Sequence, residues 1–153
     1  MKRIKGTLLL GVISIIFAAY ISAQTSNINM ELIEASITGN FQNVRSLIAD
    51  GADVNSLLVI DDGTQRTALM AASDGGYFDS AVYLISKGAL INTRTKGGTT
   101  ALMFASRNGN IDLVRYLIQK GADINAKQNE GATALLLASF SGNLDVVKLL
   151  ITK

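Results

Sequence analysis

The sequence predicts an all-α solenoid, in which similar helix–turn–helix units stack side by side. The motif Thr-Ala-Leu followed by Met or Leu recurs every 33 residues, starting at Thr67, Thr100 and Thr133. Three glycines keep the same step, at Gly76, Gly109 and Gly142. A constant period of this length is typical of stacked copies of one supersecondary unit, which buries its apolar face only against its neighbours. Such a stack offers an extended surface, and this favours binding over catalysis.

The period divides the chain into about four units, at about 30–61, 62–94, 95–127 and 128–153. The first is a weaker copy, aligned through Leu32, Ala35 and Gly39. We expect the two end units to be atypical, because each has a neighbour on one side only. The first has polar residues where its outer side is expected, at Glu31, Glu34, Gln42 and Asn43. The last stops after its second helix, so we expect its terminus to fray or to be covered by a partner.

The third unit illustrates how each first helix forms. The hydroxyl of Thr100 suits an N-cap, since it can accept a hydrogen bond from a backbone N–H that has no partner within the helix. Good helix formers follow over 101–106, and the turn Asn108-Gly109-Asn110 ends the helix. Each unit therefore begins with a short helix that is capped by its threonine.

A second helix and a loop complete the unit. Over 111–120 the apolar residues fall on one stripe, which predicts an amphipathic helix, and Gly121 suits a left-handed C-terminal cap. Residues 123–131 have the composition of a projecting hairpin loop. Asp112, with Asp79 and Asp145 at the same position, lies in the first turn of such a helix, where the helix dipole favours a carboxylate.

These units resemble ankyrin repeats, whose usual pattern is G-x-T-P-L-H-x-A-A followed by G-A-D-V-N. The third unit matches at 98–102 and 121–125, and the fourth matches at 131–135. The resemblance covers about residues 29–153. The proline and histidine of the family pattern are replaced by Ala and by Met or Leu, and Gln65 replaces a loop glycine, so we expect that turn to differ. The resemblance implies an ankyrin-repeat solenoid of about four units joined by projecting hairpin loops.

Residues 1–23 have a different character. Lys2, Arg3 and Lys5 precede an apolar run over 8–19, and Ala23 offers a small residue for cleavage. This is the outline of a secretory signal peptide that is removed after Ala23, leaving 24–153 as one domain. The alternative is an uncleaved membrane anchor. We therefore expect an exported protein, periplasmic or secreted, and a bacterial source, because eukaryotic ankyrin modules are mostly intracellular.

Charge and composition narrow the function. The chain has 14 basic and 12 acidic residues, but three of the basic ones lie in the predicted signal, so the remainder is slightly acidic. This argues against nucleic acid as a partner. With no cysteine and no histidine, disulfides, thiol chemistry, His-based catalysis and the usual zinc sites are excluded. We expect no enzyme, no metal and no cofactor.

In ankyrin repeats the loop tips and the exposed face of each first helix form a concave groove, and the resemblance implies the same groove here. The last position of the first helix is chemically varied, being Ile37, Asp74, Arg107 and Phe140 in turn. Stacking alone needs no such variety, whereas a specific surface does. The candidate partner-binding residues are Ile37, Leu57, Leu58, Val59, Ile60, Arg66, Asp74, Arg94, Lys96, Thr99, Arg107, Asn108, Lys127, Asn129, Glu130 and Phe140.

Two of these residues leave alternatives open. Phe140 is either a solvent-facing aromatic anchor for a partner or a residue packed down onto the last unit. Arg107 either pairs with an acidic group of the partner or is simply solvated.

The first loop is the other irregularity. It is four residues longer than the loops that follow, and it contains the apolar run Leu57-Leu58-Val59-Ile60. Either this finger folds back over the first unit or it docks a partner, and we favour docking because insertions in repeat proteins usually fall on the binding face.

The leading hypothesis is thus a monomeric, exported module that binds another protein through the concave groove. One alternative is an inhibitor of the immunity type, which plugs the active site of a toxin or enzyme. Another is a scaffold or stabiliser of a periplasmic protein, tethered to the membrane if the N-terminal segment is not cleaved.

Overall fold

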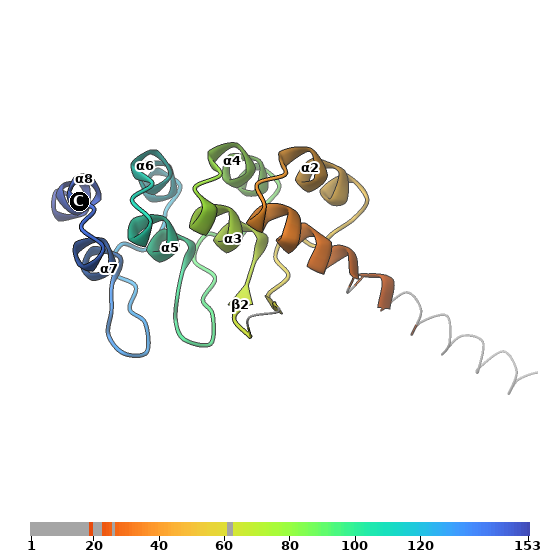
Figure 1. Ribbon diagram of the computed structural model, residues 1–153, viewed down its shortest axis with the longest axis horizontal. Coiled ribbons are helices and arrows are strands. Elements are labelled where there is room, and N and C mark those ends of the chain that lie inside the picture. The colour runs from red at the N-terminus through yellow and green to blue at the C-terminus, as the bar shows by residue number, and fades with distance from the viewer. Residues whose placement is uncertain (1–18, 20–22, 26, 61–62) are drawn as a thin grey trace, which may run out of the picture.

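A computed structural model of the chain describes residues 19, 23–25, 27–60 and 63–153 (Figure 1). The predicted signal peptide lies outside the described residues except for Ala19 and Ala23, so its cleavage stays a prediction. Within the described ranges, no helix has the length and apolar character needed to cross a bilayer.

The described chain is a stack of helix pairs, as the period predicts. Residues 27–37 are helical and precede α2 (Phe41–Ala49). The pairs that follow are α3 (Ala68–Gly75) with α4 (Phe78–Ser86), α5 (Ala101–Arg107) with α6 (Ile111–Gln119), and α7 (Ala134–Phe140) with α8 (Leu144–Ile151). In Figure 1 the first helices of the pairs form one row and the second helices another, while the loops project together from the side of the first helices. The predicted all-α solenoid is confirmed.

The threonines cap the first helices as expected. The hydroxyl oxygens of Thr67, Thr100 and Thr133 accept hydrogen bonds from the backbone N–H three residues later, at 3.2, 3.4 and 3.2 Å. Gly121 has φ +92° after α6, a left-handed conformation that glycine adopts without strain. Local chemistry therefore fixes where each helix begins and ends.

The core lies between the rows of first and second helices, and the first helices also pack against one another. Leu69 and Met70 of α3 and Leu102 and Met103 of α5 are each about 1 % exposed. Methionine stands where the family pattern has histidine, so apolar packing replaces a polar contact at these positions, as the sequence predicts. The methionine at this position is therefore buried in the apolar contact between neighbouring units.

Asparagine side chains link the units at the side of the second helices. The amide of Asn55 donates to the carbonyl oxygen of Gly88 at 3.1 Å and accepts from the N–H of Leu90 at 2.8 Å. Asn92 repeats this with Gly121 and Asp123, at 2.9 and 2.8 Å. Each asparagine thus satisfies two backbone groups of the following unit and holds the spacing between units.

The long first loop contains a small β-hairpin. Strands β1 (Leu58–Val59) and β2 (Gln65–Arg66) pair antiparallel, with Leu58 opposite Arg66. Leu57 packs against the core, and Leu58 and Ile60 are half-buried, whereas Val59 is 55 % exposed. Most of the apolar run therefore folds back and Val59 alone is exposed, while docking of a partner by this finger stays a prediction.

Candidate functional site

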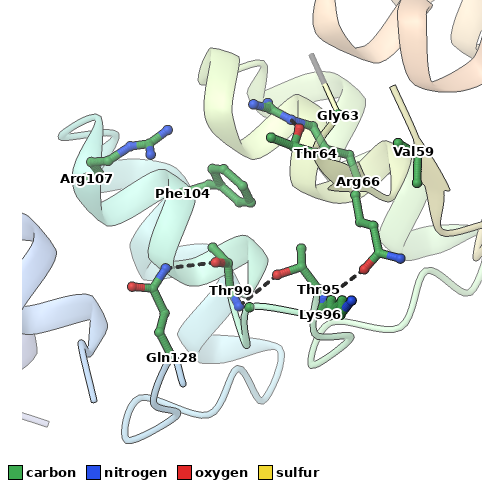
Figure 2. A pocket seen from close by; sticks show the side chains of 12 residues that line it. Val59, Gly63, Thr64, Arg66, Thr95, Lys96, Thr99, Phe104, Arg107 and Gln128 are labelled. Atoms are coloured by element: carbon green, nitrogen blue, oxygen red, sulfur yellow. Dashed lines mark hydrogen bonds between the residues drawn. The ribbon is translucent and has the colours of Figure 1, made fainter. Parts of the chain in front are cut away.

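The concave side of the stack contains a cavity of about 590 Å³ between the finger over 57–66 and the next loop. Val59 and Arg66 line it from the finger, Lys96 and Thr99 line it from the next loop, and Phe104 lines it from α5. Figure 2 shows these side chains converging from elements of two neighbouring units. This cavity lies in the predicted groove, and we call it the loop pocket.

Phe104 forms the inner wall of the loop pocket and is bracketed by two arginines. The guanidinium carbon of Arg66 lies 5.0 Å from the centre of the phenyl ring, and that of Arg107 lies 5.3 Å from it. Both distances are within the range of cation–π attraction. Phe104 is 8 % exposed, so the ring acts as a platform that orients the two guanidinium groups.

Asp74 connects the same two arginines across units. Its carboxylate accepts from Arg66 at 2.5 Å and from Arg107 at 2.9 Å, and the amide of Asn108 donates to it at 2.6 Å. Asn108 also donates to the backbone oxygen of Asp74 at 2.6 Å. Arg107 and Asn108 of the third unit are thereby tied to the last turn of α3.

This cluster shifts the ionisation of Asp74. Burial by itself raises the pKa of the Asp74 carboxyl, but the hydrogen bonds from Arg66, Asn108 and Arg107 outweigh it and leave the pKa below its ordinary value. The carboxylate is therefore ionised at neutral pH, and its charge is already matched within the chain.

The reading of Arg107 as simply solvated needs correction, because its side chain binds Asp74 through one nitrogen. It is nevertheless 47 % exposed, so part of the guanidinium remains open to the loop pocket. Pairing of Arg107 with an acidic group of a partner stays a prediction. Asp74, which the sequence suggests is solvent-facing, is 20 % exposed and acts as the hub of the cluster.

Several loop-tip candidates hold neighbouring loops together. Arg94 donates to the carbonyl oxygen of Lys127, and the amide of Asn129 donates to that of Lys96 at 2.9 Å. The hydroxyl of Thr99 accepts from Gln128 at 2.7 Å. These bonds run from one loop to the next and fix the side of the groove that the loops form.

Other predicted residues remain exposed on this surface. Lys127 and Glu130 are exposed at a loop tip, and Ile37 is partly exposed at the end of the first helix. Phe140 is 92 % exposed at the end of α7, so the alternative that it packs down onto the last unit is wrong. Phe140 and Ile37 lie outside the loop pocket, which is lined mainly by the third unit and by the finger that joins the first and second units.

Sequence reasoning missed several residues of the loop pocket, among them Phe104, Gln65 and Gln128. Phe104 aligns with Ala71 and Leu137 and so looks like ordinary core, although a phenylalanine between small or aliphatic counterparts is a signal in itself. Gln65 accepts a hydrogen bond from the N–H of Lys96 at 2.8 Å, and Gln128 reaches Thr99. The replacement of a loop glycine by Gln65 is the visible trace of this contact.

The arrangement is suited to binding. In the part of the chain that the structure describes, no group of acidic side chains is placed to hold a metal ion. The carboxylate of Asp74 is ion-paired with two arginines that line the pocket, which makes it a poor base at neutral pH. The pocket offers cations, an aromatic platform and an exposed aliphatic side chain.

Comparison with protein families agrees with the repeat geometry. A family model of ankyrin repeats, spanning three copies, matches residues 90–153, and a single ankyrin-repeat model matches residues 64–96. No curated protein matches the chain.

Proposed function

We propose that this chain, an ankyrin-repeat protein over residues 64–153, is an exported module that binds a partner protein in its concave groove. Ankyrin repeats generally act as protein–protein interaction modules and are not enzymes. The observation that carries the proposal is the loop pocket: the third unit and the finger place an aromatic wall, three cations and exposed Val59 around one cavity on the concave side. Export is supported by the basic and apolar character of residues 1–23 and by the absence of cysteine.

The architecture favours recognition by a preformed surface. Bonds between loops and the Asp74 cluster hold the pocket side chains before a partner arrives, which lowers the ordering cost of association. Val59 supplies apolar area, and Phe104 supplies a flat aromatic surface beneath the arginines. Together these features suit a projecting segment of a folded partner.

The test is capture of the partner by the full chain and by a variant whose pocket is filled. Gly97 lines the pocket, and a Cβ added there meets only the Thr95 hydroxyl oxygen, at 3.8 Å. Gly97→Trp therefore blocks the pocket without straining the backbone. Ser86→Trp, at an exposed position of α4 away from the loops, is the matched control.

We expect one protein to be retained by the wild type and by Ser86→Trp and lost with Gly97→Trp. Equal capture by all three would place the binding surface elsewhere. Tight one-to-one binding that abolishes an enzyme's activity would identify the inhibitor role, and weak or multiple partners would identify the scaffold role. The mass of the intact N-terminus, measured on protein from the producing cell, decides between a cleaved signal and a membrane tether.

Phe140→Ala measures how far the contact extends along the groove. If a partner reaches α7, loss of this ring should weaken binding by about 2 kcal/mol, the usual size of an aromatic hot spot. The thermal midpoint should stay unchanged, because a side chain that is 92 % exposed contributes little packing. Unchanged affinity would confine the partner to the first three units.

A further inference from the structure

The loop pocket has an uneven charge. Arg66, Lys96 and Arg107 line it, and among the described residues no acidic side chain does. Asp74, behind the pocket, offsets one of the three positive charges through its two ion pairs. Asp61 and Asp62 lie outside the described residues and are not included in this count. Among the described lining residues, positive charge therefore exceeds negative charge, although the chain beyond residue 23 is slightly acidic.

Two cationic groups are available to a ligand. The backbone of Lys96 is fixed by Gln65 and Asn129, but its ammonium group makes no hydrogen bond or ion pair with any described residue. Arg107 uses one terminal nitrogen for Asp74, its side chain is 47 % exposed, and its other N–H groups make no hydrogen bond to any described residue. Since Asp74 and the Phe104 ring hold this guanidinium in place, it needs little further ordering to bind an anion.

An apolar contact lies beside these cations. Val59 is 55 % exposed and lines the same cavity, on the strand that pairs with Gln65 and Arg66. In Figure 2 Val59 lies at the finger side of the pocket, and Phe104 and Arg107 lie at the helix side. A ligand that fits both features combines negative charge with a neighbouring apolar side chain.

We propose that the occupant of the loop pocket is an acidic segment of the partner protein, with at least two carboxylates that meet Lys96 and Arg107 and an apolar side chain that meets Val59. This inference rests on the proposed function and names the chemistry of the partner. The carboxylates are recognised by charge-assisted hydrogen bonds inside a cavity that limits screening by salt more than an open surface does.

A protein segment fits this site better than a nucleic acid. Nucleic-acid surfaces present a continuous row of basic side chains along the phosphate backbone. Here the cations surround one cavity instead of forming a row. A neighbouring loop tip also presents the acidic Glu130. An aliphatic contact such as Val59 also offers nothing to a phosphate.

The experiment is fluorescence polarisation with the full chain at low ionic strength. The probe is a short labelled peptide in which Glu alternates with Val. Its controls are the same peptide with Gln in place of Glu and a labelled single-stranded oligonucleotide. We expect the Glu peptide to bind and the other two not to, and we expect added salt to weaken the binding steadily.

Two charge reversals locate the contact. Lys96→Glu is expected to weaken binding of the Glu peptide about tenfold or more, since it removes one cation and adds a repelling charge. Lys120→Glu makes the same charge change beyond α6, in the row of second helices opposite the loops, and is expected to leave binding unchanged. Thermal unfolding of both variants checks that the fold is retained.

The proposal is overturned if the Glu peptide fails to bind, if the oligonucleotide binds instead, or if the two reversals have equal effects. These failures are distinct from failure of the proposed function. If Gly97→Trp abolishes partner capture while Lys96→Glu and salt leave it intact, the groove binds its partner by a different chemistry.

Discussion

The two ends of this solenoid are chemically opposite. The N-terminal end presents Glu31, Glu34 and Asn43, all exposed, at positions where the second and third units have buried residues such as Ala101 and Phe104. At the C-terminal end Leu136 and Phe140 are 54 % and 92 % exposed, and Leu144 and Ile151 are exposed as well. One end is built to face water, and the other presents the apolar side that internal units bury.

The two ends differ in the residues that stand at positions which interior units bury. Leu136 occupies the same repeat position as Met70 and Met103. Those two side chains are buried against a further unit, whereas Leu136 is half exposed. An apolar side chain at this position is therefore buried in the interior units and exposed in the last one. A polar residue at such a position ends a stack at low cost, whereas an apolar one leaves uncovered area that favours association.

The largest expected effect tests this difference in packing. Met103→Ala should lower the free energy of unfolding by about 2–5 kcal/mol, because it leaves a cavity between two units. Leu136→Ala should cost less than about 1 kcal/mol, since half of its side chain is already in water. Urea unfolding of both variants measures the pair. Similar losses would mean that the end unit is as tightly packed as the interior.

A smaller effect is expected from the asparagines that bridge units. Asn92→Ala removes two hydrogen bonds to the next unit and should cost about 1–2 kcal/mol. Asn125 is the same position one unit later, and its side chain makes no hydrogen bond to any described residue. Asn125→Ala should therefore be neutral in the same urea experiment. A clear cost at Asn125 would reveal a contact that covers this end.

The smallest effect concerns pH and the interior cluster. The pKa of Asp74 is lowered in the folded state, so its ion pairs stabilise the protein above the ordinary carboxyl pKa, and this stabilisation is lost as pH falls through the folded value. Wild type should exceed Asp74→Asn in stability by on the order of 1 kcal/mol at neutral pH, and the difference should vanish once the pH is below the lowered pKa of Asp74.

Asp145→Asn is the control for the pH experiment. Asp145 is exposed and lies 3.5 Å from Lys148, so its removal should change stability little at any pH. If the advantage of the wild type over Asp74→Asn persisted in strong acid, the cluster would act by packing and not by charge. The same cluster makes Arg107→Glu destabilising, since it would place two carboxylates side by side between the second and third units.

The repeat is the part of this molecule that sequence predicts well. Thr100 as an N-cap, the helices after it and Gly121 as a left-handed cap follow from local chemistry, and a fixed period carries them to every unit. The fold depends on little else, because each unit contacts only its neighbours.

The pocket is harder to predict because it depends on contacts between units that differ. Asp74 and Arg107 occupy the same position in successive units, and only the direction of each side chain shows that they pair with one another. Gln65 and Phe104 break the pattern of their own positions, and their roles depend on a finger of unusual length. Period and composition contain no information about these directions.

Among the described residues, α7 and α8 pack against another unit on one side only, and this sets the order in which the described stack opens. Units stacked in one dimension share stability through their interfaces, so a unit held on one side opens at lower free energy than units held on both. Helices α7 and α8 should therefore exchange their amide protons first and be the first target of proteases. The loop pocket is built on α3 and α5, which are flanked on both sides, so this terminal opening leaves its helical base in place.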